Sequence, residues 1–367
     1  MENKKGLLPV FFGVAFVWFT THFGGGFASG RQVAEFFVSY GWYAVFTPLI
    51  AMAIDGIVFY YVWDFSVKNK VYDYKSWTDE FYKPFEKIGS IIYEVIFIIT
   101  MCVATAVAFA TGGETIAASL GTPYILNTII IALVIFFLTI FGANLVRKVA
   151  TYVSVVLIAG VFIVYGANAI ASFPDIVQVI SNQTANAPFW PAIWKMILYA
   201  SFQSAAIGAY IAVADNLRTR DDAKKAAWAG FIINGVLVTL ASLTVLAYYP
   251  SILDVPVPTI FVVNNGVGGS FAEGIISILI VLGVISTGVN FVFGGVKRII
   301  SWWPSETSGN KSSIIASVLF TVLTWSIALF GLIPLVAKGY SFIGYIAIPM
   351  IVLPVFYKLI KRKFLTS

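Results

Sequence analysis

The sequence predicts an all-α polytopic membrane protein with ten transmembrane helices, arranged as two oppositely oriented halves of five. Three observations predict this. The 367 residues are 59% hydrophobic and only 11% charged, whereas a soluble domain carries roughly 25% charged residues. Ten apolar segments are long enough for a hydrocarbon core about 30 Å thick. Finally, 20 of the 23 Lys and Arg residues fall on one side of the bilayer when these segments are threaded through it.

The ten segments make up one membrane domain, 1–367, because no polar stretch between them is long enough to fold by itself. An odd number of spans in each half gives the halves opposite orientations, so we expect inverted repeats at approximately 7–172 and 190–360. The predicted spans are 7–38, 42–66, 89–118, 123–142, 147–172, 190–216, 225–249, 270–299, 312–335 and 339–360.

The basic residues predict that both termini are cytoplasmic, since Lys and Arg collect in cytoplasmic loops. Three basic residues are exceptions: Arg31 and Lys195 lie within spans, and Lys338 lies in an outside loop. We expect Lys195 to extend its ammonium group outward to the membrane interface. Because the charges are scattered through loops, they do not indicate a nucleic-acid partner. The inside loop 67–88 predicts either an amphipathic helix on the membrane surface or a solvated loop.

The first span is interrupted by glycines. Four of the seven residues in Gly24–Gly30 are Gly, and each costs up to about 1 kcal/mol in a helix interior. A straight helix over the whole segment would be about 48 Å long at ~1.5 Å per residue, too long for one upright crossing. Irregular backbone survives at this depth only where it is buried in protein or lines a wet cavity, which points to a transport site. Close helix packing through small residues is the alternative.

The sixth span carries a weaker interruption at the corresponding place of its half. Ser201–Gly208 is a small and polar island in an apolar helix, although it could also be a helix-packing face. Half-helix ends expose N–H groups that attract anions and C=O groups that attract cations. A zwitterion such as an amino acid satisfies both kinds of end at once.

We therefore expect a substrate pocket between the two interruptions, with Phe202 as an aromatic lid and Thr105 as a wall. His22, the one histidine, could carry a coupling proton, bind substrate, or be a neutral side chain bonded to a neighbouring helix. The candidate substrate-binding residues are Gly24, Gly25, Gly26, Ala28, Ser29, Gly30, Ser201, Phe202, Gln203, Ser204, Gly208, Thr105 and His22.

The eighth span contains a candidate site for a hard cation. Ser286 and Thr287 lie three and four residues beyond Gly283, so both hydroxyls face the same side as its carbonyl. Three such oxygens form part of a cation site. A Ser/Thr pair that bonds back to its own helix is the alternative.

Three segments resemble a known family. The run Gly24–Gln32 followed by Phe36 and Phe37 is similar to the first-helix signature of the YkvI-like bacterial membrane proteins, uncharacterised members of the amino acid–polyamine–organocation superfamily. Thr111–Tyr124 and Asp215–Gly230 resemble two further segments of that family. The resemblance implies the leucine-transporter (LeuT) fold, with five plus five helices and broken helices 1 and 6, in a bacterial cell membrane.

The resemblance also implies roles for particular residues. Ser286 and Thr287 would be sodium ligands with Gly283, completed by carbonyls near Thr20 and Phe23. An arginine near Arg31 closes the outer gate in this fold by pairing with an acid of the tenth helix. Span ten has no acid here, and Glu114 and Glu35 are the candidate partners at the same depth. Asp55 and Glu94 are further acids within spans.

These features predict a secondary active transporter of a small amine-bearing solute, in the first place an amino acid. It would work by alternating access and be driven by a cation gradient, with sodium preferred over a proton. We expect no cofactor other than a bound sodium ion. The chain has no phosphate-binding loop, metal-spaced His/Cys cluster or catalytic triad, so an enzyme is not predicted. The alternative function is a ligand-sensing receptor subunit of the same fold, and the sequence does not indicate the oligomeric state.

Overall fold

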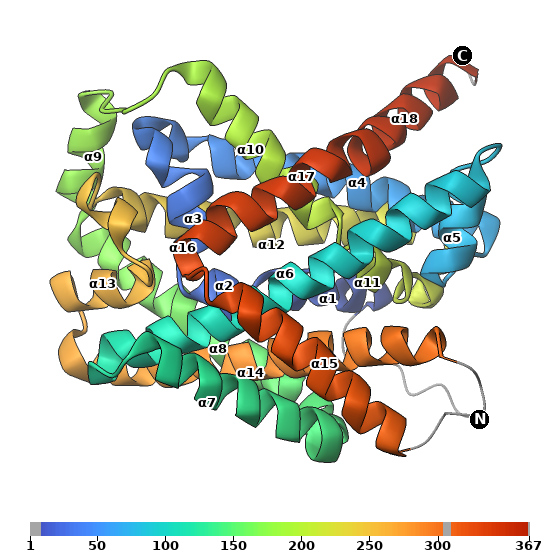
Figure 1. The fold of residues 1–367 in the computed structure, drawn as a ribbon. Coiled ribbons are helices and arrows are strands. Elements are labelled where there is room, and N and C mark those ends of the chain that lie inside the picture. The colour runs from blue at the N-terminus through green and yellow to red at the C-terminus, as the bar shows by residue number, and fades with distance from the viewer. Residues whose placement is uncertain (1–8, 304–309, 366–367) are drawn as a thin grey trace.

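The computed structural model describes residues 9–303 and 310–365, and this part of the chain contains helices and loops but no strands (Figure 1). Lys4 and Lys5, which the sequence analysis counts on the cytoplasmic side, lie outside the described residues.

The first half of the chain runs from the broken first span to the helix that follows the fifth. Its elements are α1 (Val10–His22), α2 (Gly25–Ala28), α3 (Arg31–Phe36), η1 (Val38–Val45), α4 (Thr47–Asn69), α5 (Tyr74–Phe81), α6 (Glu86–Leu120), α7 (Tyr124–Phe137), η2 (Leu138–Gly142), α8 (Ala143–Ala171) and α9 (Phe173–Ser181).

The second half begins with the bent sixth span. Its elements are α10 (Phe189–Ser204), α11 (Ile207–Ile211), η3 (Ala214–Asn216), α12 (Arg220–Leu246), η4 (Ser251–Asp254), α13 (Pro258–Asn265), α14 (Gly269–Ser301), α15 (Asn310–Ala328), α16 (Leu332–Pro334), η6 (Leu335–Tyr340), α17 (Ser341–Ala347), η7 (Ile348–Val352) and α18 (Leu353–Leu365).

The span count agrees with the prediction. In the described residues, eight helices are long and apolar enough to cross a membrane, and α10 with α11 forms a ninth span that is bent by 48°. The first span completes the ten, because it is divided into α1, which has only 13 residues, α2 and α3. The predicted end of span nine at 335 was wrong. That helix ends at Ala328, where a turn at Gly331, with φ +88°, starts the tenth span early at Leu332.

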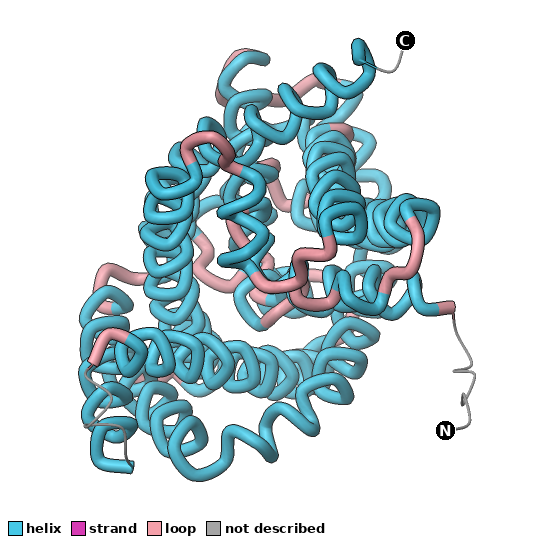
Figure 2. Tube along the Cα trace, turned by 90° about the vertical axis from the view of Figure 1, so that its right-hand side faces the viewer, coloured by secondary structure: helices cyan, strands magenta, loops and turns pink. Residues whose placement is uncertain are grey.

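The helices pack in two groups. In the first, α4 and α12 pack together, α1 lies on α12, and α10 lies on α4. In the second, α6, α7, α14 and α15 contact one another. The broken first span contacts both groups, because α2 packs against α6 and α14 and α3 packs against α12. Figure 2, turned by 90° from Figure 1, shows helices joined by loops throughout the described residues. In Figure 1, α9 and α13 lie at the left end of the molecule, and α5 and the end of α18 lie at the right.

The loop 67–88 contains the short helix α5. Asp73 caps it by accepting a hydrogen bond from the backbone N–H of Ser76 at 2.9 Å, and hydrogen bonds from Ser76 hold the pKa of this carboxyl below its usual value. Trp77 and Phe81 are buried against the rest of the protein. The segment is therefore a helix, as one of the two predictions had it, but its apolar face is covered by protein.

A glycine sets how closely α1 approaches α12. A Cβ added at Gly230 would overlap the indole ring of Trp18, which is itself buried. That ring also packs edge-on against Phe59 of α4, with ring centroids 4.7 Å apart. The position of the first span thus depends on the missing side chain at Gly230.

We predict that Gly230→Ala lowers the stability of the protein by about 1–3 kcal/mol, the usual cost of overpacking a filled core. The matched control is Gly274→Ala in α14, where an added Cβ meets nothing within 4 Å. The control should be neutral or slightly stabilising, because Ala favours a helix over Gly. Thermal unfolding of both purified variants in the same detergent measures the difference, and equal unfolding temperatures would contradict this account of the packing.

Candidate substrate and cation site

The first interruption of span one leaves unpaired backbone groups. Phe23 ends α1 by donating its N–H to the carbonyl of Phe19 at 3.0 Å. In the described part of the chain, no hydrogen bond is made to the carbonyls of Thr20 and Phe23 or by the N–H of Gly24. Unpaired backbone carbonyls and an unpaired N–H group are therefore adjacent at this break.

The eighth span approaches the same break. A Cβ added at Gly24 would lie only 2.8 Å from the hydroxyl oxygen of Thr287, so α14 comes close here because Gly24 has no side chain. Ser286, the neighbour of Thr287, is buried, as is Gly283. The five residues predicted for the cation are thus divided between two elements that face each other.

The hydroxyls of Ser286 and Thr287 differ from other helical hydroxyls in their hydrogen bonding. The hydroxyls of Thr20, Thr105 and Ser201 donate to carbonyls of their own helices at 3.0, 2.7 and 2.7 Å. Neither Ser286 nor Thr287 makes such a bond to any described residue. The alternative of back-bonding therefore applies to Thr105 and Ser201, which were predicted to bind substrate, and does not apply to the α14 pair.

The second part of the span-one interruption, Ala28–Gly30, is closed by α13. Thr259 of α13 donates its N–H to the carbonyl of Ser29 at 3.0 Å and its hydroxyl to the carbonyl of Ala28 at 2.7 Å. Gly30 has φ +79°, and an added Cβ would lie 2.9 Å from the hydroxyl of Tyr165. The carbonyls of Ala28 and Ser29, two of the predicted substrate residues, are thus held by protein partners.

The sixth span breaks after Ser204. The hydroxyl of Tyr93 on α6 accepts the N–H of Gly208 at 2.9 Å and donates to the carbonyl of Ala205 at 3.4 Å. Tyr93 thus bridges the break, and Gly208 makes its bond to this side chain. Ser204 donates its hydroxyl to Asp55 of α4 at 3.1 Å.

His22 is bonded at both ring nitrogens. Nδ1 lies 2.8 Å from Oδ1 of Asn234, and Nε2 lies 2.7 Å from the hydroxyl of Tyr199. Because the amide nitrogen of Asn234 donates to the carbonyl of Gly230 at 2.7 Å, its oxygen faces the ring, and Nδ1 carries the hydrogen. This is the arrangement of a neutral histidine bonded to neighbouring helices, one of the three interpretations left open by the sequence.

Aromatic rings fill the space between the two breaks. Phe27 lies 4.3 Å from Phe23, and Phe202 stacks on Tyr340 of η6 with centroids 4.5 Å apart and an interplanar angle of 3°. Phe36 of α3 lies 5.4 Å from Phe202. Aromatic side chains, Phe202 among them, therefore occupy the region where the pocket was predicted.

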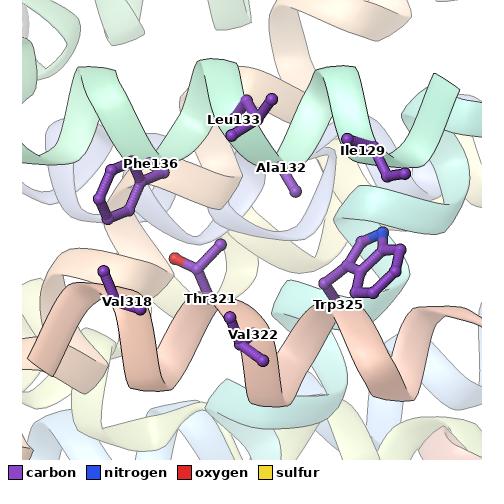
Figure 3. Close-up of a pocket in the computed structure, with 8 residues that line it drawn as sticks. All are labelled: Ile129, Ala132, Leu133, Phe136, Val318, Thr321, Val322 and Trp325. Carbon is purple, nitrogen blue, oxygen red and sulfur yellow. The ribbon is translucent and has the colours of Figure 1, made fainter. Parts of the chain in front are cut away.

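The cavities in the described part of the chain lie away from the first break. One of about 460 Å³ is lined by Tyr40, Lys195 and Ser341. One of about 360 Å³ lies between α7 and α15, lined by apolar residues such as Leu133 and Val322 (Figure 3). Another, of about 520 Å³, lies beside the first half of α1 and includes Val213 and Asn216.

Two polar residues near Gly26 were not among the predicted site residues. A Cβ added at Gly26 would lie 3.6 Å from the amide nitrogen of Gln32 and 3.8 Å from the hydroxyl of Tyr340. Gln32 is buried, and its amide oxygen has no hydrogen-bond partner in the described residues. The sequence signal was a Gln two residues after Gly30. Gln203, from the predicted set, is also buried.

Arg31 belongs to an ion-pair network at the end of this site that lies next to η4. It donates to the carbonyls of Leu253 and Val255 at 2.6 and 3.2 Å and pairs with Glu35 at 3.1 Å. Glu35 also pairs with Lys195 of α10 at 3.0 Å, so the prediction that Lys195 extends outward was wrong.

The remaining gate residue, Glu114, lies on α6. The neighbouring Gly113 packs against Thr128 and Tyr124 of α7. Of the two predicted acidic partners of Arg31, the structure therefore brings Glu35 to it. Lys195 in turn bonds Ser341 of α17 at 3.1 Å, which joins the network to the tenth span.

Comparison with known proteins gives the following similarities. No model of a known protein family matches this chain. It is 25% identical over 366 residues to the uncharacterized membrane protein YkvI of Bacillus subtilis (strain 168), and the match covers 96% of both chains. This confirms the resemblance that the sequence motifs indicated.

Solved structures are similar over almost the whole chain. The inward-facing conformation of Mhp1 gives a TM-score of 0.65 at 14% identity, covering 97% of this chain and 80% of Mhp1. A substrate-bound, outward-open Na⁺-coupled sialic acid symporter gives 0.63 at 15%, covering 96% and 79%. MhsT in complex with L-phenylalanine gives 0.60 at 13%, covering 95% and 89%. These likenesses, with the broken first and sixth spans, show that the chain is a multi-pass membrane protein with the LeuT fold.

Proposed function

We propose that the protein is a secondary active transporter of a small amine-bearing solute, most simply an amino acid, driven by a sodium gradient. The observation that carries this proposal is the set of unpaired groups at the first break. The N–H of Gly24 suits a carboxylate, and the carbonyls of Thr20 and Phe23 suit a cation. The fold agrees with it, since its solved relatives include a Na⁺-coupled symporter and a protein that holds L-phenylalanine.

The chemistry near Gly26 supports the choice of solute. The Gln32 amide and the Tyr340 hydroxyl offer neutral hydrogen-bonding groups. The rings of Phe27, Phe202 and Tyr340 provide an apolar surround. A zwitterion with an apolar side chain and no net charge matches this combination. The solute enters when the rings separate.

The coupling ion is proposed to bind between α14 and the first break. Ser286 and Thr287 supply hydroxyl oxygens that are not used by their own helix, and Gly283, Thr20 and Phe23 supply carbonyl oxygens. An all-oxygen set of neutral ligands is typical of a hard monovalent cation. Sodium bound there would join α14 to the end of α1, so binding would favour one position of the first span.

Alternating access requires that the outer end opens. The network of Arg31, Glu35 and Lys195 joins α3, η4 and α10 across that end, and we infer that it is the outer gate. The loop charges support an orientation with both termini in the cytoplasm of a bacterial cell. In that orientation the gate lies on the outside.

We predict that sodium raises the unfolding temperature of the purified protein, and that Ser286→Ala and Thr287→Ala abolish the rise. Sodium at one hundred times its Kd would stabilise the folded state by about 2.7 kcal/mol. Choline chloride at equal ionic strength is the salt control. Thr324→Ala is the control variant, because the Thr324 hydroxyl is buried and bonds the carbonyl of Phe320 at 2.7 Å. Full sodium stabilisation in both α14 variants would refute the site.

We predict that Glu35→Gln opens the outer end. Losing this carboxylate leaves Arg31 and Lys195 without their acidic partner, and a shift of ~1.4 kcal/mol is enough for a tenfold change in population. The readout is labelling of Thr105→Cys, in a Cys102→Ala background, by a membrane-impermeant maleimide added outside. The labelling rate should rise at least tenfold.

The control for this gate experiment is Glu80→Gln, which removes an exposed pair with Lys83 and should leave the labelling rate unchanged. An unchanged rate in the Glu35 variant would show that the network does not close the outer end. Uptake of a radiolabelled mixture of the twenty protein amino acids into proteoliposomes then separates a transporter from a ligand-sensing receptor, which would bind without uptake.

A further inference from the structure

Asp55 is a carboxyl group inside the membrane that the proposed sodium site does not use. It lies about two turns from the start of α4 and is fully buried. One of its oxygens, Oδ1, accepts the hydroxyl of Ser204 at 3.1 Å. The other, Oδ2, is buried and has no partner in the described residues.

Asp55 differs from three other acids that lie within spans. Glu35 pairs with Arg31 and Lys195. Glu94 pairs with Arg298 and accepts the hydroxyl of Tyr74 at 2.8 Å. Asp64, nine residues beyond Asp55 on the same helix, pairs with Arg220 and Arg362. Each of these three carboxylates therefore has at least one cation to offset its charge.

The elements packed against α4 give Asp55 no such cation in the described residues. The nearest titratable groups on α10 and α11 are the phenols of Tyr199 and Tyr210. On α1 there is only His22, whose ring nitrogens bond Asn234 and Tyr199. The cation of α10, Lys195, pairs with Glu35, and Arg220 of α12 and Arg362 of α18 pair with Asp64. The other titratable groups on these elements make no ion pair with Asp55 in the described residues: Tyr40 and Tyr43 on η1, Asp215 on η3, Asp221, Asp222, Lys224 and Lys225 on α12, and Tyr357, Lys358 and Lys361 on α18.

An ionised carboxylate in this place would be unstable. Removing a single charge from water costs several kcal/mol even after relaxation, and only a nearby opposite charge or a full set of hydrogen bonds offsets the cost. The single hydrogen bond from Ser204 is too little to offset this cost. We propose that Asp55 is a proton-binding site, and that its occupancy is linked to the bend of the sixth span. Its role in coupling rests on the proposed transport function.

The link to the sixth span follows from the position of Ser204. This residue is the last of α10, and the chain bends by 48° between α10 and α11. A change in that bend moves the hydroxyl that Asp55 accepts and changes the access of water to Oδ2. The proton on Oδ2 then passes to a water molecule, leaving a carboxylate and a hydronium ion, and it returns when the site closes.

His22 is less suited to this task, although the sequence drew attention to it. Its protonation would require Nε2 to become a donor toward the hydroxyl of Tyr199, while Nδ1 already donates to Asn234. Asp55 has an oxygen that can take a proton without breaking any bond. A proton at Asp55 would be a second coupling ion, separate from the sodium proposed at α14.

The proton is tested directly by infrared spectroscopy of the full-length protein in lipid nanodiscs. At pH 7 we expect a carbonyl band of a protonated carboxylic acid, above the amide I region and shifted in D₂O, that is lost in Asp55→Asn. Asn is close to isosteric with the neutral acid and can still accept from Ser204, so this variant should fold. Asp221→Asn, which removes an exposed acid paired with Lys225, should lose no such band. A wild-type spectrum with no Asp55-dependent band would overturn the proposal.

Coupling is tested in proteoliposomes that contain sodium on both sides and a trapped pH-sensitive dye. Addition of the twenty protein amino acids outside should acidify the interior in the wild type and at least tenfold less in Asp55→Asn. Acidification that is equal in both, or entry of solute into wild-type proteoliposomes without acidification, would overturn the coupling role. If no solute enters wild-type proteoliposomes, the proposed function fails, and the infrared band still decides whether Asp55 binds a proton.

Discussion

Backbone polar groups within a bilayer must find partners in the protein, and this constraint governs the two broken spans. Each interruption frees N–H and C=O groups that no lipid can satisfy. Thr259 takes up the carbonyls at Ala28 and Ser29, and Tyr93 takes up the groups at the sixth span. The carbonyls of Thr20 and Phe23 and the N–H of Gly24 have no partner in the described residues. These groups lie beside Thr287 of α14.

The spans and the first break could be predicted from the sequence because they depend on local composition. Long apolar segments and the positions of Lys and Arg define the crossings. The glycines at 24–26 and 30 interrupt a helix whatever its neighbours are. Gly30, with φ +79°, needs a residue without Cβ. The sixth break was a weaker signal, because Ser201–Ser204 is helical in the structure and the bend comes only after it.

The partners of the site residues could not be predicted, because contacts between distant segments leave no local pattern. Lys195 faces inward because Glu35, on a segment far away in the chain, offers a carboxylate. Thr105 and Ser201 have hydroxyls as Ser286 and Thr287 do, yet only the first two bond to their own helices. Gln32 lies two residues beyond Gly30, but its burial beside Tyr340 depends on how the tenth span packs.

Asp64 is shared by two arginines that come from different helices, Arg220 of α12 at 2.5 Å and Arg362 of α18 at 2.5 Å. Asp64 lies on α4, so the two pairs tie α4 to both α12 and α18. If α18 moved away from α4, Asp64 would lose Arg362 but would still pair with Arg220 of α12. A carboxylate with a single basic partner would lose all compensation in the same movement.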